Sequence, residues 1–532
     1  SSQYAKKGHQ SIEAAIIKIM FFDYLRIMKR NGSFIAMDLM NCFDRMAHPV
    51  SSLCAQRLGT SSTVSEYMIN TLCRMQHYIR TAYGDSEWSY TGSSRRPLQG
   101  AVQGNGAASP LFIAISCVII SFLEAQVVGF VVKSAITLTT LNIIAIMYVD
   151  DSDILIGSTS ATESERTIRN RVQHAADIYH KGVYQTGGAI RPDKCRWFLI
   201  TFEWKAGKWR YGKNTEIDDI YIKDTHNKYQ KVKRLSVSEG WKGLGVIAAP
   251  DGNWNDQVEF LVEEKIKPWN NSIQNSLLQK HDVYRSAFTS IFKTVEYPLA
   301  ATYMSKRQCK YINTHLHKKF LSKIGINGHL PLAYRYAPKR FQGLGSFEVE
   351  SKQFIKKLKT FLWHASTKSQ LGDFIKLTIE SQQLLIGTNH HLFSISFEKY
   401  GCLAETSWIT ELWRTSNEYD IQIRGFYERT QPCRENDFAL MDKLIEADSY
   451  TDEDLQSINR CRLYLQVQNI SDIATGIGNK ISYCAIHHIR DPENRSNTNG
   501  RIKPYLQNLT GKYGTMQWQT FGVMNKIEFN LP

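Results

Sequence analysis

The sequence predicts an α/β protein of the α+β kind, in which an antiparallel sheet with flanking helices precedes a mostly helical second half. Short apolar runs at residues 33–37, 141–147 and 154–157 have the length and composition of buried strands. Residues 160–180 instead place apolar side chains at helical spacing. Beyond about residue 255 the pattern is mostly helical. The sheet is therefore expected in the first half of the chain.

The composition is that of a globular protein with a polyanionic partner. The chain has 532 residues and a net charge of +15, spread without a basic tail, which favours nucleic acid as partner. The 10 cysteines show no framework spacing, which favours free thiols in a reducing compartment. The most apolar stretch, residues 111–132, contains Glu124 and Gln126 and is expected to be core. With no secretory signal in view, we expect an intracellular protein of the nucleus or cytoplasm that contacts no membrane.

Four segments carry expectations about local structure. Ser11 is placed to cap a helix that ends at residues 31–32. Residues 213–233 are charged and predict a loop. Residues 315–323 and 352–363 carry Lys and His on one side and large apolar residues on the other. Each of these two is either an ordinary amphipathic helix with a solvated basic face or a helix that faces nucleic acid.

Adjacent carboxylates lie between two of the predicted strands. Residues 148–151 have the sequence Tyr-Val-Asp-Asp, so a β-hairpin with Asp150 and Asp151 at its turn is predicted. Aspartate is a common turn former, so a solvated turn is one interpretation. Paired carboxylates also repel each other, so a turn that carries both usually holds a cation.

A third carboxylate, Asp38, directly follows the strand predicted at residues 33–37. Phosphoryl transfer to a nucleotide uses two divalent ions about 4 Å apart, which clamp the attacking and leaving oxygens. Mg²⁺ prefers hard oxygen ligands and keeps several waters, so two or three carboxylates on neighbouring strands suffice. Asp38, Asp150 and Asp151 would provide that set.

The order of these motifs resembles that of a reverse transcriptase, most closely those of non-LTR (LINE-type) retroelements. The segment around Asp38 matches the first palm motif, residues 103–112 match the second, and residues 148–151 match the third. Residues 187–194 resemble the fourth, and residues 243–245 resemble the segment that begins the approach to the thumb. Each piece alone is weak, but their order and gaps are those of the family.

The resemblance implies a right-hand polymerase fold. It predicts partial fingers and an antiparallel palm in residues 1–245, and a helical thumb-like region in residues 246–370. It assigns no role to a C-terminal region in residues 371–532. The likeness extends over residues 1–250 and continues to about residue 365 only in general character.

The resemblance also implies roles in catalysis. Asp38 and Asp150 would ligate two Mg²⁺ ions, or Mn²⁺ in their place, and Asp151 would be a supporting carboxylate. Lys194 would protonate or neutralise the departing pyrophosphate. For Lys194, a surface lysine after a turn is the alternative interpretation.

Further residues would contact the substrates. Phe43 would lie beneath the sugar and exclude a 2′-hydroxyl, which favours deoxynucleotides; a core phenylalanine is the alternative. Gln103 and Gly104 would lie against the template and the incoming base, where glycine permits close backbone approach. Tyr148 and Val149 would lie under the primer end.

Three functions are compatible with these features. The first is an RNA-directed DNA polymerase of a retrotransposon, which extends a DNA primer on an RNA template with deoxynucleoside triphosphates. The second is a non-catalytic, RNA-binding, maturase-like descendant, because the family's basic finger strands would precede residues 3–13 and the loop at residues 103–110 is one residue longer than is usual in the family. The third, an RNA-dependent RNA polymerase, is disfavoured by Phe43 and by Val149, where glycine is common.

Overall fold

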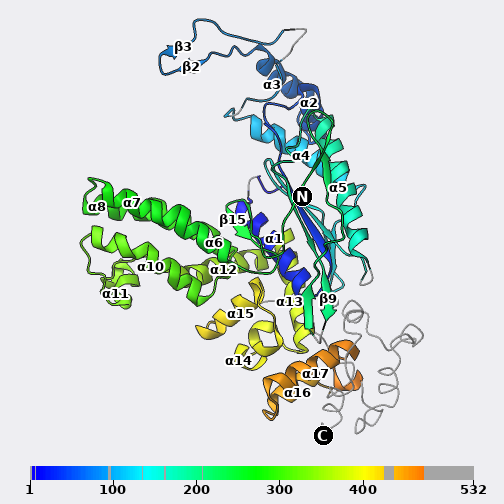
Figure 1. Cartoon of the computed structure of the whole chain (residues 1–532), viewed down its shortest axis with the longest axis vertical. Helices are drawn as coiled ribbons and strands as arrows, with labels where there is room; N and C mark the ends of the chain where they lie inside the picture. Colours follow the sequence, from blue (N-terminus) through cyan, green and yellow to red (C-terminus); the bar gives the residue numbers. More distant parts are fainter. Residues whose placement is uncertain are drawn as a thin grey trace.

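A five-stranded sheet forms the centre of the fold (Figure 1). The computed structural model describes residues 3–5, 8–93, 98–102, 104–134, 136–160, 163–205, 208–424, 437–465 and 467–472. The strand order is β13–β8–β1–β7–β6, and all neighbours are antiparallel except β13 and β8. These strands are β1 (Gly32–Met37), β6 (Ala145–Tyr148), β7 (Asp151–Gly157), β8 (Arg196–Ile200) and β13 (Lys233–Arg234). Helices flank this sheet, which confirms the predicted α/β class.

The side chains of the sheet alternate between two hydrophobic cores. On β1, Phe34 and Ala36 belong to one core, called here the first core, whereas Ile35 and Met37 belong to the second. This alternation follows from the two-residue period of a strand. Asp38, which follows Met37, therefore continues the first-core face.

Four helices cover the second-core side of the sheet. They are α2 (His48–Arg57), α3 (Ser62–Arg74), α4 (Ala108–Glu124) and α5 (Glu165–Gln185). The apolar face predicted for residues 160–180 is confirmed on α5, where Ile168, Val172, Ala175 and Tyr179 are fully buried. Helix α4 contributes buried side chains along its length, so the apolar stretch predicted to be core is core.

Helix α1 (Ser11–Ile27) is the central helix of the first core. Almost all of its residues are buried, including the charged Lys18 and Asp23. The prediction that Ser11 caps this helix was wrong, because Gln10 is the N-cap residue. The Ser11 hydroxyl instead lies 2.8 Å from the Tyr297 hydroxyl, so it makes a tertiary hydrogen bond.

Small two-stranded sheets extend from the centre. In the described residues they pair β2 (Arg80–Thr81) with β3 (Gly84–Asp85), β4 (Phe130–Lys133) with β5 (Thr140–Ile143), β9 (Phe202–Lys205) with β10 (Lys208–Tyr211), β11 (Tyr221–Lys223) with β12 (Tyr229–Lys231), and β14 (Trp241–Gly243) with β15 (Val246–Ala248). The loop predicted at residues 213–233 was wrong in part, since it contains the β11–β12 hairpin. The Asp224 carboxylate accepts the N–H groups of His226 and Lys228, which closes that turn.

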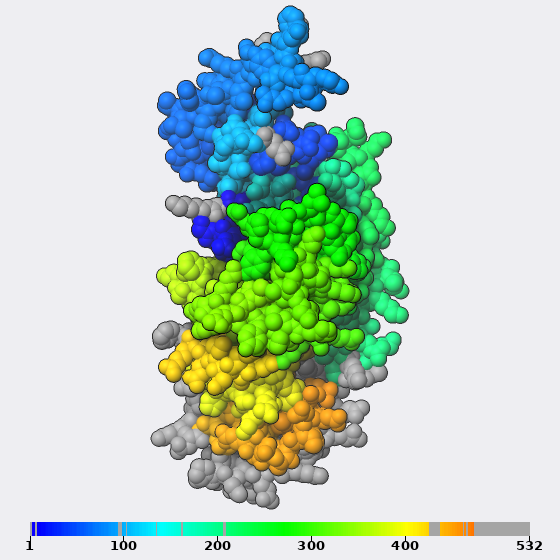
Figure 2. All heavy atoms as spheres, turned by 90° about the vertical axis from the view of Figure 1, so that its left-hand side faces the viewer, coloured from blue at the N-terminus to red at the C-terminus, as the bar shows by residue number. Residues whose placement is uncertain are grey.

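Beyond β15 every described element is helical, as predicted (Figure 1). Figure 2 shows the green to orange surface that this part of the chain forms on one face of the molecule. The elements up to residue 341 are α6 (Asn255–Glu259), η1 (Phe260–Ile266), α7 (Lys267–Asn275), α8 (Lys280–Ser286), η2 (Ala287–Ile291), α9 (Phe292–Glu296), η3 (Tyr297–Ala300), α10 (Lys306–Lys323), α11 (Leu332–Tyr336) and η4 (Lys339–Phe341). The later ones are α12 (Val349–Ser366), α13 (Gln370–Ile386), η5 (Leu392–Ser394), α14 (Phe397–Tyr400), η6 (Gly401–Leu403), α15 (Trp408–Glu418), α16 (Leu440–Glu446), α17 (Asp452–Leu465) and η7 (Ile470–Asp472). Helices α7, α8 and α10 project from the body of the molecule.

Helix α13 joins the C-terminal part of the chain to the first core. It packs against α1 and α12. The rings of Phe374 and Tyr24 lie 6.3 Å apart, and the Tyr4 hydroxyl donates to Gln370 Oε1 at 2.8 Å. One hydrophobic core therefore runs past residue 370, while the predicted domain limits stay a prediction.

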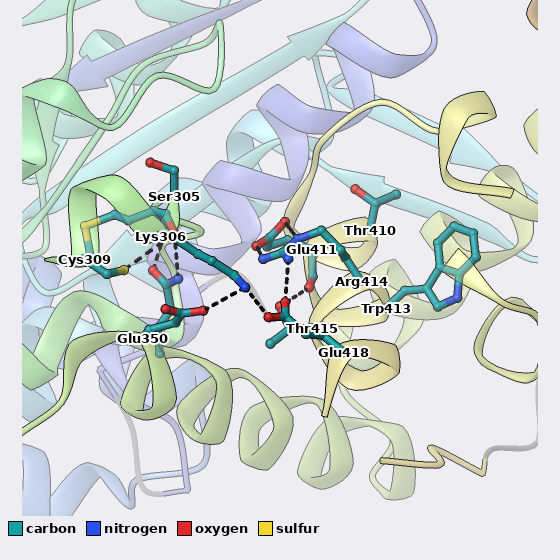
Figure 3. Close-up of polar contacts among 12 residues, drawn as sticks. Ser305, Lys306, Cys309, Glu350, Thr410, Glu411, Trp413, Arg414, Thr415 and Glu418 are labelled. Carbon is teal, nitrogen blue, oxygen red and sulfur yellow. Dashed lines mark hydrogen bonds and ion pairs between the residues drawn. The ribbon is translucent and has the colours of Figure 1, made fainter. Parts of the chain in front are cut away.

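The two helices with predicted basic sides, α10 and α12, are only partly solvated on those sides. Lys318 and Lys359 are exposed, but His317 and Lys357 are buried. Figure 3 shows the polar contacts of Lys306, at the place where α10, α12 and α15 meet. The ammonium of Lys306 pairs there with carboxylates of α12 and α15. Neither helix is thus a plain amphipathic helix with a solvated basic face.

Candidate functional site

Asp38 lies at the end of the central strand, and its backbone is held on both sides. Its N–H donates to Cys195 Sγ at 3.4 Å, and its carbonyl accepts the Arg191 N–H at 2.9 Å. The turn between α5 and β8 therefore fixes the point where β1 ends. The Asp38 side chain is 35% exposed, which leaves its carboxylate accessible.

Asp38 directly follows β1, and Asp151 is the first residue of β7, the antiparallel neighbour of β1. The pairing of β1 with β7 sets Met37 opposite Ser152. One further step along both strands brings Asp38 level with Asp151. Two carboxylates that are far apart in sequence are thus adjacent on one face of the sheet.

The predicted acid-bearing hairpin is present. Strands β6 and β7 pair with Tyr148 opposite Asp151, which leaves Val149 and Asp150 as the turn. Asp150 is exposed. Val149 has a φ of +57°, a left-handed conformation that is costly for a β-branched residue. The Val149 N–H donates to Gln3 Oε1 at 3.3 Å, so a buried side chain supports this strained turn.

Gln3 holds the hairpin from the segment that precedes α1. Its side-chain amide donates to Ser116 Oγ of α4 at 2.9 Å. The next residue, Tyr4, donates its N–H to the Met147 carbonyl at 2.8 Å, so the segment runs alongside β6. This role was not predicted, because a lone glutamine ahead of a helix carries no pattern.

The carboxylates open onto a cleft of about 180 Å³. Asp38, Asp151 and Asp153 line it from the sheet, together with Lys194 and Arg196. Residues 241–244 of β14 and its turn line the other side. Small-molecule pockets commonly begin near 300 Å³, so a ligand of that size would fill this cleft and extend out of it.

Burial and mutual repulsion raise the pKa of these carboxyl groups. The pKa of Asp151 is raised to about 6, first by burial and then by the charges of Asp150 and Asp153. Burial also raises the pKa of Asp38, Lys194 opposes that shift, and Asp150 adds to it. The three predicted metal ligands therefore sense one another electrostatically.

Lys194 lies at the rim of the cleft. Its Nζ is 4.0 Å from Asp38 Oδ2, and its side chain is 54% exposed. It stands in the turn that also holds the Asp38 backbone, directly before β8. A positive charge is thus placed beside the carboxylates yet free to contact a ligand in the cleft.

The donor chemistry of the site suits a hard divalent cation. Asp38, Asp150 and Asp151 offer the carboxylate oxygens that Mg²⁺ and Mn²⁺ prefer. Within the described residues, no three His, Cys, Asp or Glu side chains gather into a metal-ready cluster. Like charges repel, so these three carboxylates stand apart unless a cation draws them together.

Phe43 is half-buried and fastened to the glycine-rich loop. Its ring centroid lies 5.8 Å from that of Phe112, and its carbonyl accepts the Ala101 N–H at 2.8 Å. Gly100, with a φ of +84°, passes so close that a Cβ there would lie 2.5 Å from the Phe43 carbonyl oxygen. Only glycine fits at this crossing, which ties the loop to the segment after β1.

Two loop residues were predicted to face the template and the incoming base. Gln103 lies outside the described residues. Gly104 has a φ of +95°, and a Cβ added there would meet nothing within 4 Å, so its backbone conformation accounts for the glycine. The substrate contacts assigned to these residues, and to Phe43, Tyr148 and Val149, stay predictions.

Asp153 of the cleft forms an ion pair with Lys18 of α1, although neither residue was predicted. Asp153 lines the cleft, and its Oδ2 lies 3.3 Å from Lys18 Nζ. Both carried a signal in the sequence. Asp153 stands two residues after Asp151 on a strand and so shares its face. Lys18 is a basic residue in the middle of an apolar helical run, where lysine is unusual.

The fold and the site define a mixed α/β protein whose central antiparallel sheet bears an acidic cleft with a basic rim. No family model and no curated protein matches the chain. Among solved structures it is similar to the telomerase of Candida albicans in complex with the TWJ fragment of telomeric RNA, with a TM-score of 0.28 and 12% identity. The match covers 72% of this chain, which spans about half, 51%, of that telomerase chain. Among the described helices, none has the length and apolarity needed to cross a membrane.

Proposed function

We propose that the chain is an RNA-directed DNA polymerase of the non-LTR retroelement kind, which extends a DNA primer on an RNA template. One observation carries the proposal: Asp38, directly after β1, and Asp151, the first residue of the adjacent strand β7, line one cleft, and Asp150 stands in the turn between β6 and β7. Its substrates would be deoxynucleoside triphosphates. The net charge of +15 supports nucleic-acid partners in the nucleus or cytoplasm.

Asp38, Asp150 and Asp151 would hold two Mg²⁺ ions. Bound there, such ions supply Lewis-acid stabilisation of the charge that develops on the attacking and leaving oxygens. The residues of the chain supply the placement. The turn before β8 fixes Asp38, and the Gln3 side chain fixes the hairpin that bears Asp150. Lys194, 4.0 Å from Asp38, is placed to neutralise or protonate the departing pyrophosphate.

Primer extension on an RNA template with Mg²⁺ tests this function. We expect the wild type to incorporate deoxynucleotides and Asp150→Ala to abolish incorporation. The matched control is Asp177→Ala, which removes an exposed carboxylate of α5 and should leave extension unchanged. Affinity for RNA should be similar in all three proteins and should fall with salt, because it comes from phosphate contacts.

The second candidate is a non-catalytic RNA-binding scaffold of the maturase-like kind. It is favoured by the spacing of the carboxylates, since no three-ligand cluster is preformed among the described residues. This candidate predicts RNA binding without extension by the wild type, with either Mg²⁺ or Mn²⁺. That outcome would refute the polymerase proposal.

A further inference from the structure

We propose that Lys18 is a positioning residue of the acidic site. By pairing with Asp153 inside the protein, Lys18 leaves cation binding to the three carboxylates proposed as metal ligands. The inference rests on the proposed function, because it concerns the same site. It assigns a role to Asp153, a charged residue of the cleft that the motifs do not include, and to its buried partner Lys18.

Asp153 is a fourth carboxylate on the face that bears Asp38 and Asp151. It follows Asp151 by two residues on β7, a separation of roughly 7 Å along the strand. All three line the same cleft. Asp153 is the most deeply buried of the three, with 8% of its surface exposed. An unpaired carboxylate at this depth would compete with its neighbours for a cation.

Lys18 supplies the positive charge that pairs with Asp153. It lies in the middle of α1, its side chain is 1% exposed, and its Nζ is 3.3 Å from Asp153 Oδ2. Among the described residues, Asp153 is the ion-pair partner of Lys18. The ammonium also lies 5.5 Å from the centroid of the Phe34 ring. The pair is therefore formed within the first core and not on the surface.

The backbone of β14 confines the ammonium. A Cβ at Gly243 would lie 2.4 Å from Lys18 Nζ and 4.0 Å from Asp153 Oδ2, so a larger residue there would displace the end of the Lys18 side chain. The adjoining turn is itself held, because the Tyr297 hydroxyl donates to the Leu244 carbonyl at 2.8 Å. The Lys18 ammonium thus stays beside Asp153 and does not reach the open part of the cleft.

This arrangement predicts opposite effects of the two partners on cation binding. Removing the Lys18 charge frees an anion next to the metal ligands, which should strengthen cation binding. Removing the Asp153 charge leaves a buried cation there, which should weaken it. If the ion pair served stability alone, both variants would have a lower melting temperature, and their cation affinities would not shift in opposite directions.

The experiment measures binding of Mn²⁺ alone to the full chain at about pH 8, by electron paramagnetic resonance. We expect Lys18→Met to bind Mn²⁺ on the order of tenfold more tightly and Asp153→Asn on the order of tenfold more weakly. The double variant should return to within about twofold of wild type, because both charges are gone. Primer extension should slow in each single variant and recover in the double variant.

Two controls define the interpretation. Lys357→Met removes another buried lysine, on α12 and away from the cleft, and should leave Mn²⁺ affinity unchanged. Asp38→Asn should lose most Mn²⁺ binding. If Lys18→Met does not fold, recovery of the affinity of Asp153→Asn in the double variant carries the same test.

Three outcomes would overturn the inference. Shifts of Mn²⁺ affinity in the same direction in both single variants, or no shift with lowered melting temperatures, would assign the pair to stability alone. Failure of the double variant to recover would also refute it. A wild type that binds no Mn²⁺ and extends no primer would overturn the proposed function and this inference together. If the wild type is active but the two single variants do not shift Mn²⁺ affinity in opposite directions, only the inference is refuted.

Discussion

Lys194 Nζ lies 4.0 Å from Asp38 Oδ2, and the two residues meet because β1 ends where its antiparallel neighbour β8 begins. The pairing of Ala36 with Arg196 sets this register. An ion pair this exposed contributes at most about 1 kcal/mol to stability. The main effect of this pair is therefore the positive charge that Lys194 places at the mouth of the cleft.

Replacing Lys194 with Met should separate catalysis from stability. We expect primer extension to slow by about 10- to 100-fold, since a positioned acid or cation at the leaving group is lost. The melting temperature should be unchanged. Lys181→Met, which removes an exposed lysine of α5, should alter neither quantity. If Lys194→Met extends primers at the normal rate, Lys194 has no catalytic role and is a surface lysine after a turn.

Phe43 should control the choice of sugar. Phe43→Val shortens the side chain that packs against Phe112 and should open space for a 2′-hydroxyl. We expect the preference for deoxynucleotides over ribonucleotides to fall by about 10-fold or more, measured as the ratio of kcat/KM values. If only the melting temperature falls, Phe43 is a core residue and another group discriminates the sugar.

The sheet and its acids were predictable because each rests on a local pattern. The apolar run before Asp38 and the Asp pair between two strands placed both halves of the site, and strand pairing brought them together. The amphipathic face of α5 was equally clear, since its stripe repeats over five turns. Such periodic signals depend on one element at a time.

The supporting residues were not predictable from one element. Gln3, Lys18 and Gly243 act through contacts with segments more than a hundred residues away, which only the folded chain brings together. Ser11 illustrates the converse case. Its sequence position suits a cap, but a hydrogen bond to Tyr297 uses its hydroxyl instead. Tertiary contacts thus override local preference where elements meet.

Val149 should tolerate glycine better than an ordinary strand valine does. Its φ of +57° costs about 1–3 kcal/mol in a β-branched residue, which glycine avoids. Against this gain, glycine costs about 0.5–1 kcal/mol in backbone entropy. It also removes the packing of the half-buried valine side chain. We expect Val149→Gly to lie within about 1 kcal/mol of wild type in urea unfolding.

The matched control for this substitution is Val131→Gly. Val131 is also half-buried, but it lies in the regular strand β4 and shows no positive φ. The Val131→Gly variant should be destabilised by at least about 1 kcal/mol more than the Val149→Gly variant. Equal losses in the two variants would mean that the turn stores no strain.

The raised pKa of Asp151 predicts a pH dependence of cation binding. Because its folded pKa is about 6 against an ordinary 3.8, the folded protein retains a proton at this carboxyl up to mildly acidic pH. Mn²⁺ binding should therefore weaken as the pH falls through about 6, since a protonated carboxyl is a poor ligand. Asp151→Asn should bind more weakly and lose the step near this pH.

The same shift has a defined effect on stability. A raised carboxyl pKa favours folding while the folded state holds the extra proton, and this contribution is lost as the pH rises from about 3.8 to about 6. Asp151→Asn should consequently gain stability relative to wild type at neutral pH and gain little near pH 4. A gain that is independent of pH would contradict the assignment of this titration to Asp151.

Lys357 should destabilise the fold at neutral pH. It is 2% exposed, its Nζ has no hydrogen-bond partner among the described residues, and burial lowers its pKa to about 8 from the ordinary 10.5. The unfolded chain therefore binds the proton more tightly, so stability should rise with pH between about 8 and 10.5, by about 3 kcal/mol. Contacts with the Tyr303 and Trp408 rings, at 5.4 and 5.7 Å, offset part of the cost of the charge.

Lys357→Met keeps most of the side-chain volume and removes that charge. We expect it to be more stable than wild type by about 2 kcal/mol near pH 7 in urea unfolding, with the difference closing towards pH 10.5. Lys359→Met, an exposed position on the same helix, should show neither effect. A loss of stability near pH 7 in Lys357→Met would show that the contacts of the ammonium with the two rings outweigh the cost of burying it.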